Sequence, residues 1–239
     1  LPGNGPADPT KLYDYVYADG KSENVDFVLA NRSPDSVLCF GSSEFYISKD
    51  KVSMCPQAVL GENVTGLDMT FIGQGYDQSL WQAIAAGAYG GRVSGEKVML
   101  IVSPQWFFKG NGDQDKFESK FSYSLYRAFA QNPGISQETK DYVRRRCEEL
   151  GVDAGQLDAA SAATPLDAVN DWLFSLADGW RLRSQVPNIV SLAPSKSPAR
   201  TAGEPTGEPD WDALLAEARS EGAAASTTND YGVYDDYWE

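Results

Sequence analysis

Three short apolar segments, each followed by small or polar residues, constrain the fold of this chain more than any other feature. They are residues 36–40 (SVLCF), 67–72 (LDMTFI) and 97–102 (KVMLIV). Apolar runs of this length are typical of strands buried on both faces of a parallel sheet. Because helical patterns alternate with them, the sequence predicts an α/β fold, a three-layer α/β/α sandwich with a parallel sheet.

Helical periodicity follows the second and third of these strands. Apolar residues at 80–88 repeat at the spacing of one helix face, and residues 117–129 carry an apolar side chain every fourth position, which predicts one continuous helix. Ser136 is expected to cap a helix that ends at Gly151. A further helix is expected over about 165–184.

The chain is acidic and contains no histidine. Its 239 residues carry a formal net charge of −14, which argues against a nucleic-acid-binding protein, because such proteins present basic surfaces. No apolar run reaches the roughly 20 residues that a membrane-spanning helix needs. Without histidine, these residues alone cannot form a complete Ser-His-Asp or Cys-His site.

The sequence predicts no metal or cofactor site. Cys39, Cys55 and Cys147 lie far apart without metal-ligand spacing, although a disulfide between Cys55 and Cys147 stays open for a protein outside the cell. The loop at 73–79 (GQGYDQS) lacks the GxGxxG pattern and a following lysine. Nucleotide binding is therefore not expected.

The end of the chain differs in composition from the rest. Residues 204–239 contain ten acidic residues and one arginine, and residues 191–209 contain four prolines. The proline-rich stretch predicts a flexible loop, because it has little apolar surface to bury. We expect one domain over 1–239, and the start at Leu1 indicates a boundary from which a preceding segment has been removed.

Small or polar residues follow all three predicted strands. These loops are residues 41–44 (GSSE), 73–79 (GQGYDQS) and 103–106 (SPQW). In a parallel sheet the carboxyl ends of the strands meet at one edge, where ligands bind. We therefore expect the three loops to converge.

Each loop has an ordinary structural interpretation, but together they contain the groups that acyl transfer needs. A serine after the first strand can act as a nucleophile or merely cap a turn. The second loop can offer backbone N–H groups to an oxyanion, or be a turn capped by Asp77. In the third, Gln105 can donate from its side-chain amide, and Trp106 can line a pocket or pack under a loop. A nucleophile and two donors at neighbouring strand ends favour acyl transfer.

These motifs resemble those of the DltD family, the D-alanyl transfer proteins of teichoic-acid D-alanylation. The resemblance rests on residues 40–44 (FGSSE), 72–80 (IGQGYDQSL) and 102–107 (VSPQWF), and it continues into 210–239. It implies a variant of the SGNH-hydrolase fold, which is flavodoxin-like. It also implies a Gram-positive protein anchored in the cell membrane by one N-terminal helix, absent from this chain, with its domain on the extracellular face.

The resemblance assigns roles to individual residues. Ser43 matches the nucleophile and Gly75 the oxyanion glycine, while Gln105 takes the place of the oxyanion asparagine of simpler SGNH enzymes. Glu44, beside the nucleophile, could contact the ammonium group of D-alanine or simply lie at a helix N-terminus.

The resemblance extends to substrate and partners. Gln78 and Trp106 are expected to bind substrate. The implied activity moves D-alanyl esters onto lipoteichoic acid through a seryl intermediate. The implied partners are teichoic acid, a membrane O-acyltransferase and a D-alanyl donor derived from a phosphopantetheine carrier protein.

The chain departs from the family pattern at one point. The family completes its triad with an Asp-x-x-His motif near the C-terminus, and this chain has no histidine. We therefore expect a domain that is incomplete at its C-terminus and nearly inactive by itself. Two alternatives remain: an SGNH esterase or O-acetyltransferase acting on a cell-wall glycan, and a non-catalytic scaffold of the envelope.

Overall fold

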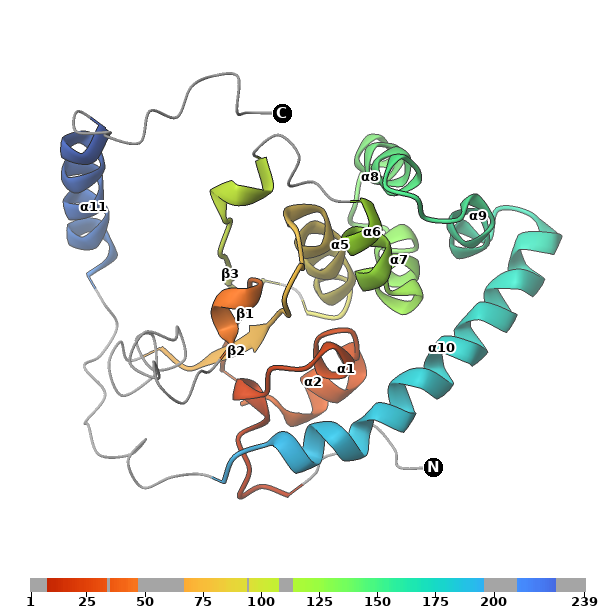
Figure 1. Ribbon diagram of the computed structural model, residues 1–239, viewed down its shortest axis with the longest axis horizontal. Coiled ribbons are helices and arrows are strands. Elements are labelled where there is room, and N and C mark those ends of the chain that lie inside the picture. Colours follow the sequence, from red (N-terminus) through yellow and green to blue (C-terminus); the bar gives the residue numbers. More distant parts are fainter. Residues whose placement is uncertain are drawn as a thin grey trace.

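In the described part of the chain, three strands form a parallel sheet near the centre of the structure (Figure 1). β1 (Val37–Phe40) is flanked by β2 (Met69–Ile72) and β3 (Val98–Leu100), in the order β2-β1-β3. All three strands lie within the apolar segments that predicted them. The computed structural model describes residues 8–33, 35–46, 67–93, 95–107, 114–195 and 210–226.

Helices cover one face of the sheet. Leu38 and Phe40 of β1 belong to a hydrophobic core that includes residues of α5 (Ser79–Gly90) and α7 (Tyr123–Ala130). The ring of Phe40 meets that of Tyr89 edge-on, with their centroids 5.5 Å apart. This contact joins the central strand to α5.

The N-terminal part of the chain packs on the other side. Cys39 and Phe71 lie in a second cluster with aromatic residues of the segment around η1 (Tyr13–Tyr15). Two short helices follow, α1 (Asp19–Ser22) and α2 (Val25–Asn31), and Val28 of α2 returns to the first core, with Leu38 and Phe40. The sheet therefore lies between helical elements, and the predicted α/β/α sandwich is confirmed.

The segment 117–129, predicted as one helix, forms two. α6 (Gln114–Lys120) ends at Lys120, and α7 begins at Tyr123, so Phe121 and Ser122 lie between the two helices. The side-chain oxygen of Ser122 accepts a hydrogen bond from the N–H of Leu125 at 3.4 Å, which caps α7. A capping serine within an apolar repeat thus divides the helix.

The next helix has the predicted boundaries. α8 (Gln137–Glu149) is capped by Ser136, whose side-chain oxygen accepts from the N–H of Thr139 at 3.2 Å. Gly151 follows with φ of 87°, a conformation that favours glycine. α9 (Ala154–Ser161) comes next.

The long helix α10 (Pro165–Leu192) continues beyond the predicted end at residue 184. It contains Pro187, which normally disfavours a helix interior because it removes one backbone N–H. On either side of the proline, Val186 and Ile189 are buried in a cluster with Tyr13 and other N-terminal residues. This packing keeps the last turns helical.

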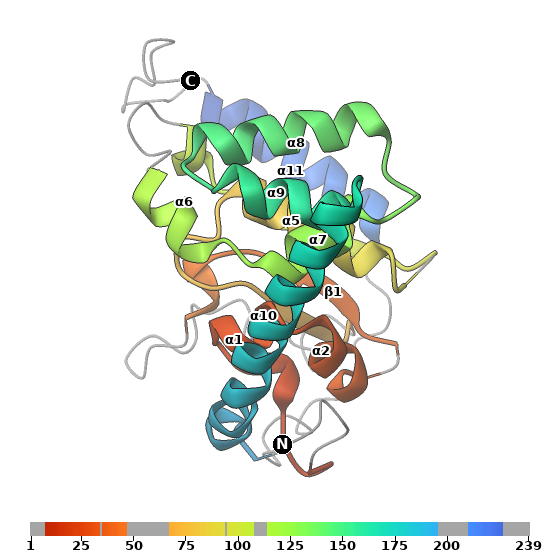
Figure 2. The same ribbon diagram turned by 90° about the vertical axis from the view of Figure 1, so that its right-hand side faces the viewer.

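Figures 1 and 2 show α10 running from α9 to the N-terminal helices. Beyond it, the Leu12 N–H donates to the carbonyl of Pro194 at 2.9 Å. Of the predicted loop at 191–209, residues 191–192 are helical and 196–209 lie outside the described residues. The predicted flexibility of this loop stays a prediction.

Several large apolar side chains of α10 face solvent. They include Leu166, Val169, Trp172, Leu173, Leu176 and Trp180.

α11 (Trp211–Ser226) is exposed over residues 211–220. Among the described residues, no helix is long and apolar enough to cross a bilayer.

Candidate active site

The first strand exit presents one serine to solvent and buries its neighbour. Ser43 begins η2 (Ser43–Phe45) and is exposed, whereas Ser42 is fully buried. The Ser42 hydroxyl donates to the carbonyl of Gln74 at 3.2 Å. Among the described residues, neither the hydroxyl nor the N–H of Ser43 has a hydrogen-bond partner. Ser43, the predicted nucleophile, is thus the serine that a substrate can reach.

The turn requires glycine at position 41, because the side chains of Glu44 and Phe45 occupy the space that a Cβ atom would need. A Cβ atom on Gly41 would lie 2.4 Å from Oε1 of Glu44 and 2.4 Å from the ring of Phe45. Oε1 of Glu44 accepts a hydrogen bond from the Ser42 N–H at 2.6 Å. Glu44 therefore fixes the turn, and its predicted contact with a substrate ammonium group stays a prediction.

The second exit is a tight turn held by a buried carboxyl group. Oδ2 of Asp77 accepts from the N–H of Gln74 at 2.6 Å, and the Asp77 N–H donates to the Gln74 carbonyl at 3.0 Å. Burial, with a further contribution from the charge of Asp19, raises the pKa of Asp77 well above its ordinary value. Its other oxygen, Oδ1, is buried and has no partner among the described residues.

The N–H of Gly75, expected to be open to an oxyanion, already has a partner. It donates to the hydroxyl oxygen of Tyr17 at 2.7 Å and, over a longer distance of 3.2 Å, to Oε1 of Gln74. Tyr17 also packs edge-on against Tyr46, with ring centroids 5.5 Å apart. Burial raises the pKa of Tyr17, and nearby carboxylates add to this effect. The phenol therefore keeps its proton at neutral pH.

Hydrogen bonds join the three exits at one edge of the sheet. The Gly41 N–H donates to the carbonyl of Ile72 at 3.1 Å, which connects the first exit to the second. The side-chain amide of Gln82 on α5 donates to the carbonyls of Asp77, at 3.4 Å, and Ile101, at 3.3 Å. Gln82 thus connects the second exit to the third.

The third exit forms η4 (Pro104–Phe107), which begins four residues after the last residue of β3. Gln105 lies in it, but its side chain lies outside the described part of the structure. Its predicted donation to an oxyanion stays a prediction. Trp106 is half-buried, and its indole Nε1 is buried without a partner among the described residues.

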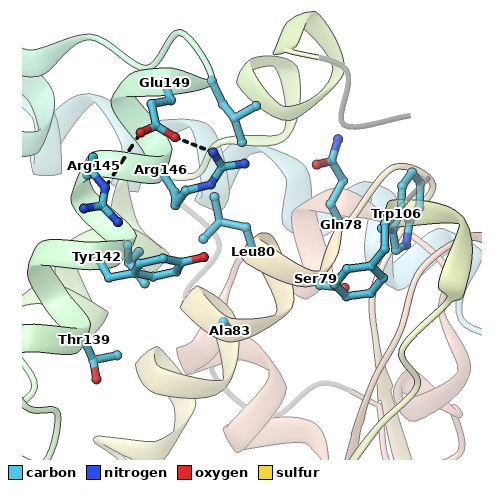
Figure 3. A pocket seen from close by; sticks show the side chains of 13 residues that line it. Gln78, Ser79, Leu80, Ala83, Trp106, Thr139, Tyr142, Arg145, Arg146 and Glu149 are labelled. Atoms are coloured by element: carbon cyan, nitrogen blue, oxygen red, sulfur yellow. Dashed lines mark hydrogen bonds and ion pairs between the residues drawn. The ribbon is translucent and has the colours of Figure 1, made fainter. Parts of the chain in front are cut away.

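A pocket of about 970 Å³ opens beside this exit, between α5, α8 and η4 (Figure 3). Gln78 and Trp106, both predicted to bind substrate, line it. Arg146 and Tyr142 of α8 reach toward the start of α5 from the opposite wall. The structure therefore places two predicted residues at one cavity next to the strand exits.

Two of the three cysteines lie in the described part of the chain. Cys39 and Cys147 are buried free thiols whose pKa burial raises to about 12, and Cys55 lies outside the described residues. Within the described ranges, no group of three or more acidic, histidine or cysteine side chains could hold a metal ion.

Comparison with known proteins places this arrangement in a family. The family model described as "DltD protein" matches residues 16–239, nearly the whole chain. The chain belongs to the DltD family. Protein DltD of Staphylococcus aureus (strain NCTC 8325 / PS 47) is 26% identical over 204 residues, which cover 84% of this chain and 51% of that protein.

A second DltD protein gives the same result. Protein DltD of Bacillus subtilis (strain 168) is 25% identical over 215 residues, which cover 84% of this chain and 52% of that protein. The chain thus spans about half the length of the curated DltD relatives it matches. The resemblance inferred from the loop motifs is confirmed at the level of the family.

Two positions in this DltD-family site were missed in the sequence. Tyr17 lies far before the first motif, and no pattern around it indicates contact with Gly75. The second position is Lys21, which is fully buried. Its Nζ donates to the carbonyls of Asp14, at 2.9 Å, and Phe71. Burial lowers the pKa of Lys21 to about 8. A lysine next to a glycine in a polar stretch gives no indication of such burial.

Proposed function

We propose that this protein transfers D-alanyl groups to teichoic acid, with Ser43 as the nucleophile. The observation that carries the proposal is the exposure of Ser43 at the end of the central strand. The loop of Ser43 is joined to the Gly75 loop by the hydrogen bond from the Ser42 hydroxyl to the carbonyl of Gln74. Membership of the DltD family supports the substrate, since proteins of this family are involved in D-alanylation of teichoic acids.

The chemistry follows from a serine hydroxyl beside hydrogen-bond donors. Oγ of Ser43 attacks the carbonyl carbon of a D-alanyl ester or thioester, and its proton passes to a base. The tetrahedral intermediate collapses to a D-alanyl-serine ester and releases the donor alcohol or thiol, which takes up a proton. A glycerol hydroxyl of teichoic acid then attacks the ester, and Ser43 is restored.

Charge on the carbonyl oxygen requires donors in place before the reaction. The N–H of Ser43 is one, and Gln105 is a second if its amide turns toward the site. Because the Gly75 N–H donates to Tyr17, we assign the third donation to the phenol of Tyr17, which the amide polarises. Loss of one such donor typically slows acyl transfer about 10²–10³-fold.

The proposal includes the surroundings that the family implies. The acyl donor would come from a carrier protein by way of a membrane O-acyltransferase, on the outer face of the cell membrane. The base is not a histidine of these 239 residues, since they contain none. Unassisted serine is a poor nucleophile, so we expect these residues by themselves to react slowly.

A serine-directed fluorophosphonate tests the nucleophile. We expect peptide mass spectrometry to find the label on Ser43. Ser43→Ala should abolish it, whereas Ser42→Ala, which removes the neighbouring buried hydroxyl, should keep it. Added imidazole should accelerate labelling of the 239-residue chain. Absence of label on Ser43 with and without imidazole would favour a non-catalytic scaffold and overturn the proposal.

A second assay separates the substrate from the chemistry. The protein should hydrolyse or transfer D-alanyl esters faster than acetyl esters of the same alcohol, and the Ser43→Ala variant should lose both activities. A preference for acetyl esters would indicate an esterase or O-acetyltransferase of cell-wall glycan instead.

A further inference from the structure

The pocket beside the third exit carries an excess of positive charge. Arg145 and Arg146 of α8 both line it, and both pair with the single carboxylate of Glu149. Figure 3 shows Glu149 between the two guanidinium groups, with Arg146 on the side of α5. Two cations thus share one anion, which leaves one positive charge in the wall of the pocket, although the chain as a whole carries −14.

The opposite wall also offers donors. α5 begins at this pocket, and its N-cap residue, Gln78, makes no side-chain capping hydrogen bond. The first N–H groups of a helix attract anions. Ser79 and Trp106 belong to the same lining, but Oγ of Ser79 and Nε1 of Trp106 are themselves buried, without partners among the described residues. The donors that this wall offers to a ligand are therefore the N–H groups at the start of α5, which face the two arginines of α8.

Aromatic rings lie between these polar groups. The guanidinium of Arg145 lies over the ring of Tyr142, 5.4 Å from its centroid. Trp106 and Phe107 form the wall on the side of η4, and Phe107 is 40% exposed. Apolar faces next to cations suit a ligand in which short carbon segments separate anionic groups.

We propose that this pocket binds a phosphodiester chain with short polyol links. Arg146 and Arg145 contact the phosphate oxygens, for which the planar guanidinium group is well suited. Tyr142 and Trp106 contact the carbon atoms between them. The site would hold the acceptor chain while one of its hydroxyl groups reaches Ser43. In this last respect it rests on the proposed function, since teichoic acid has this chemistry.

Binding of a synthetic hexamer of glycerol phosphate to the 239-residue chain tests the proposal by calorimetry. We expect Arg146→Gln to weaken binding about tenfold or more, as expected for the loss of a hydrogen bond to a charged group. Arg145→Gln should weaken it less, because that side chain is more exposed. Circular dichroism and thermal melting confirm that each variant is folded.

Two further variants sharpen the test. Arg144→Gln is the matched control: it removes the same charge from the neighbouring position, but Arg144 pairs with Glu148 and Asp158 and does not line the pocket. It should change affinity less than twofold. Glu149→Gln should strengthen binding severalfold, because it removes the carboxylate that competes for both arginines.

The proposal is overturned if the hexamer does not bind, if Arg144→Gln weakens binding as much as Arg146→Gln, or if Glu149→Gln weakens it. Binding to phosphatidylglycerol vesicles without binding to the soluble hexamer would assign the charge to a membrane surface and also overturn it. Fluorophosphonate labelling of Ser43 does not depend on this pocket. Labelling without hexamer binding would therefore reject the pocket alone, and binding without labelling would reject the nucleophile alone.

Discussion

The two outer strands of the sheet are both short and mainly apolar, but their environments differ. All side chains of β2 are buried, whereas Val98 and Leu100 of β3 are 51% and 49% exposed. Both strands pair with β1 in parallel. The difference lies in what packs on them, so apolar character alone does not report how deeply a strand is buried.

Contacts on the β2 side explain its burial. The ring of Phe71 lies between those of Phe45 and Tyr15, with centroid distances of 5.2 and 5.5 Å. Lys21 donates to the carbonyl of the same residue, and Ser22 accepts from the N–H of Gly73 at 3.0 Å. Strand, aromatic cluster and buried polar groups thus stabilise the first two exits together.

Truncation of one residue on each strand gives the largest contrast. Phe71→Ala should lower the free energy of unfolding by about 3–5 kcal/mol, because it leaves a cavity among aromatic rings. Leu100→Ala should cost less than about 1 kcal/mol, since half of that side chain is already in water. Urea denaturation measures both, and equal losses would contradict the asymmetry.

Glycine substitutions sharpen the same contrast. A Cβ on Gly73 would lie 2.2 Å from the carbonyl oxygen of Gly41. Gly73→Ala should therefore force the first two exits apart, cost about 2–4 kcal/mol and abolish labelling of Ser43. Beside β3, a Cβ on Gly95 meets nothing within 4 Å, although φ is +72°. Gly95→Ala should lower the free energy of unfolding by about 1 kcal/mol, from backbone strain alone, and Ser43 should still be labelled. Loss of labelling in Gly95→Ala would contradict the contrast between the β2 side and the β3 side.

The buried lysine gives the β2 side a distinct pH dependence. The pKa of Lys21 is about 8 in the folded protein and 10.5 ordinarily, so the unfolded chain binds more protons between these values. The free energy of unfolding should rise with pH across this window, by up to about 3 kcal/mol relative to Lys21→Met. Denaturation of both proteins at pH 7.5 to 10 measures the difference. Parallel curves would show that Lys21 titrates normally.

The smallest predicted effect concerns the Gly75 loop. Tyr17→Phe keeps the ring and removes the hydroxyl, so fluorophosphonate labelling of Ser43 should slow about tenfold. This is less than the loss of a full donor, because the Gly75 N–H then keeps only the longer bond to Oε1 of Gln74, at 3.2 Å, and can turn toward the oxyanion. Tyr76→Phe, in the same loop but exposed, should leave the rate unchanged. Faster labelling of Tyr17→Phe would mean that the phenol blocks the amide instead of assisting it.

Strand positions and loop motifs could be predicted because they depend on short-range patterns. Apolar runs located all three strands, and Ser136 and Gly151 marked the ends of α8. The break at Ser122 could not be predicted, because the apolar residues repeat every four positions through the capping serine. The last turns of α10 could not be predicted either, since packing of Val186 and Ile189 outweighs the local effect of Pro187.

The site was predictable only in part, for the same reason. Ser43 and Gly75 belong to motifs, and their exits follow strands. Tyr17 and Gln82 act across the fold, and each depends on a partner far away in sequence. The arginines of α8 lie in an ordinary charged helix, and only the facing start of α5 makes them part of a pocket.

α10 brings distant parts of the chain together. Its end passes directly beside the first described residues, where Leu12 bonds to Pro194 and Lys11 pairs with Ser195 in an isolated antiparallel bridge. The two ends of the segment 11–195 therefore lie side by side, although most of the described chain separates them in sequence. Fraying of the residues before η1 would for this reason also release the end of α10.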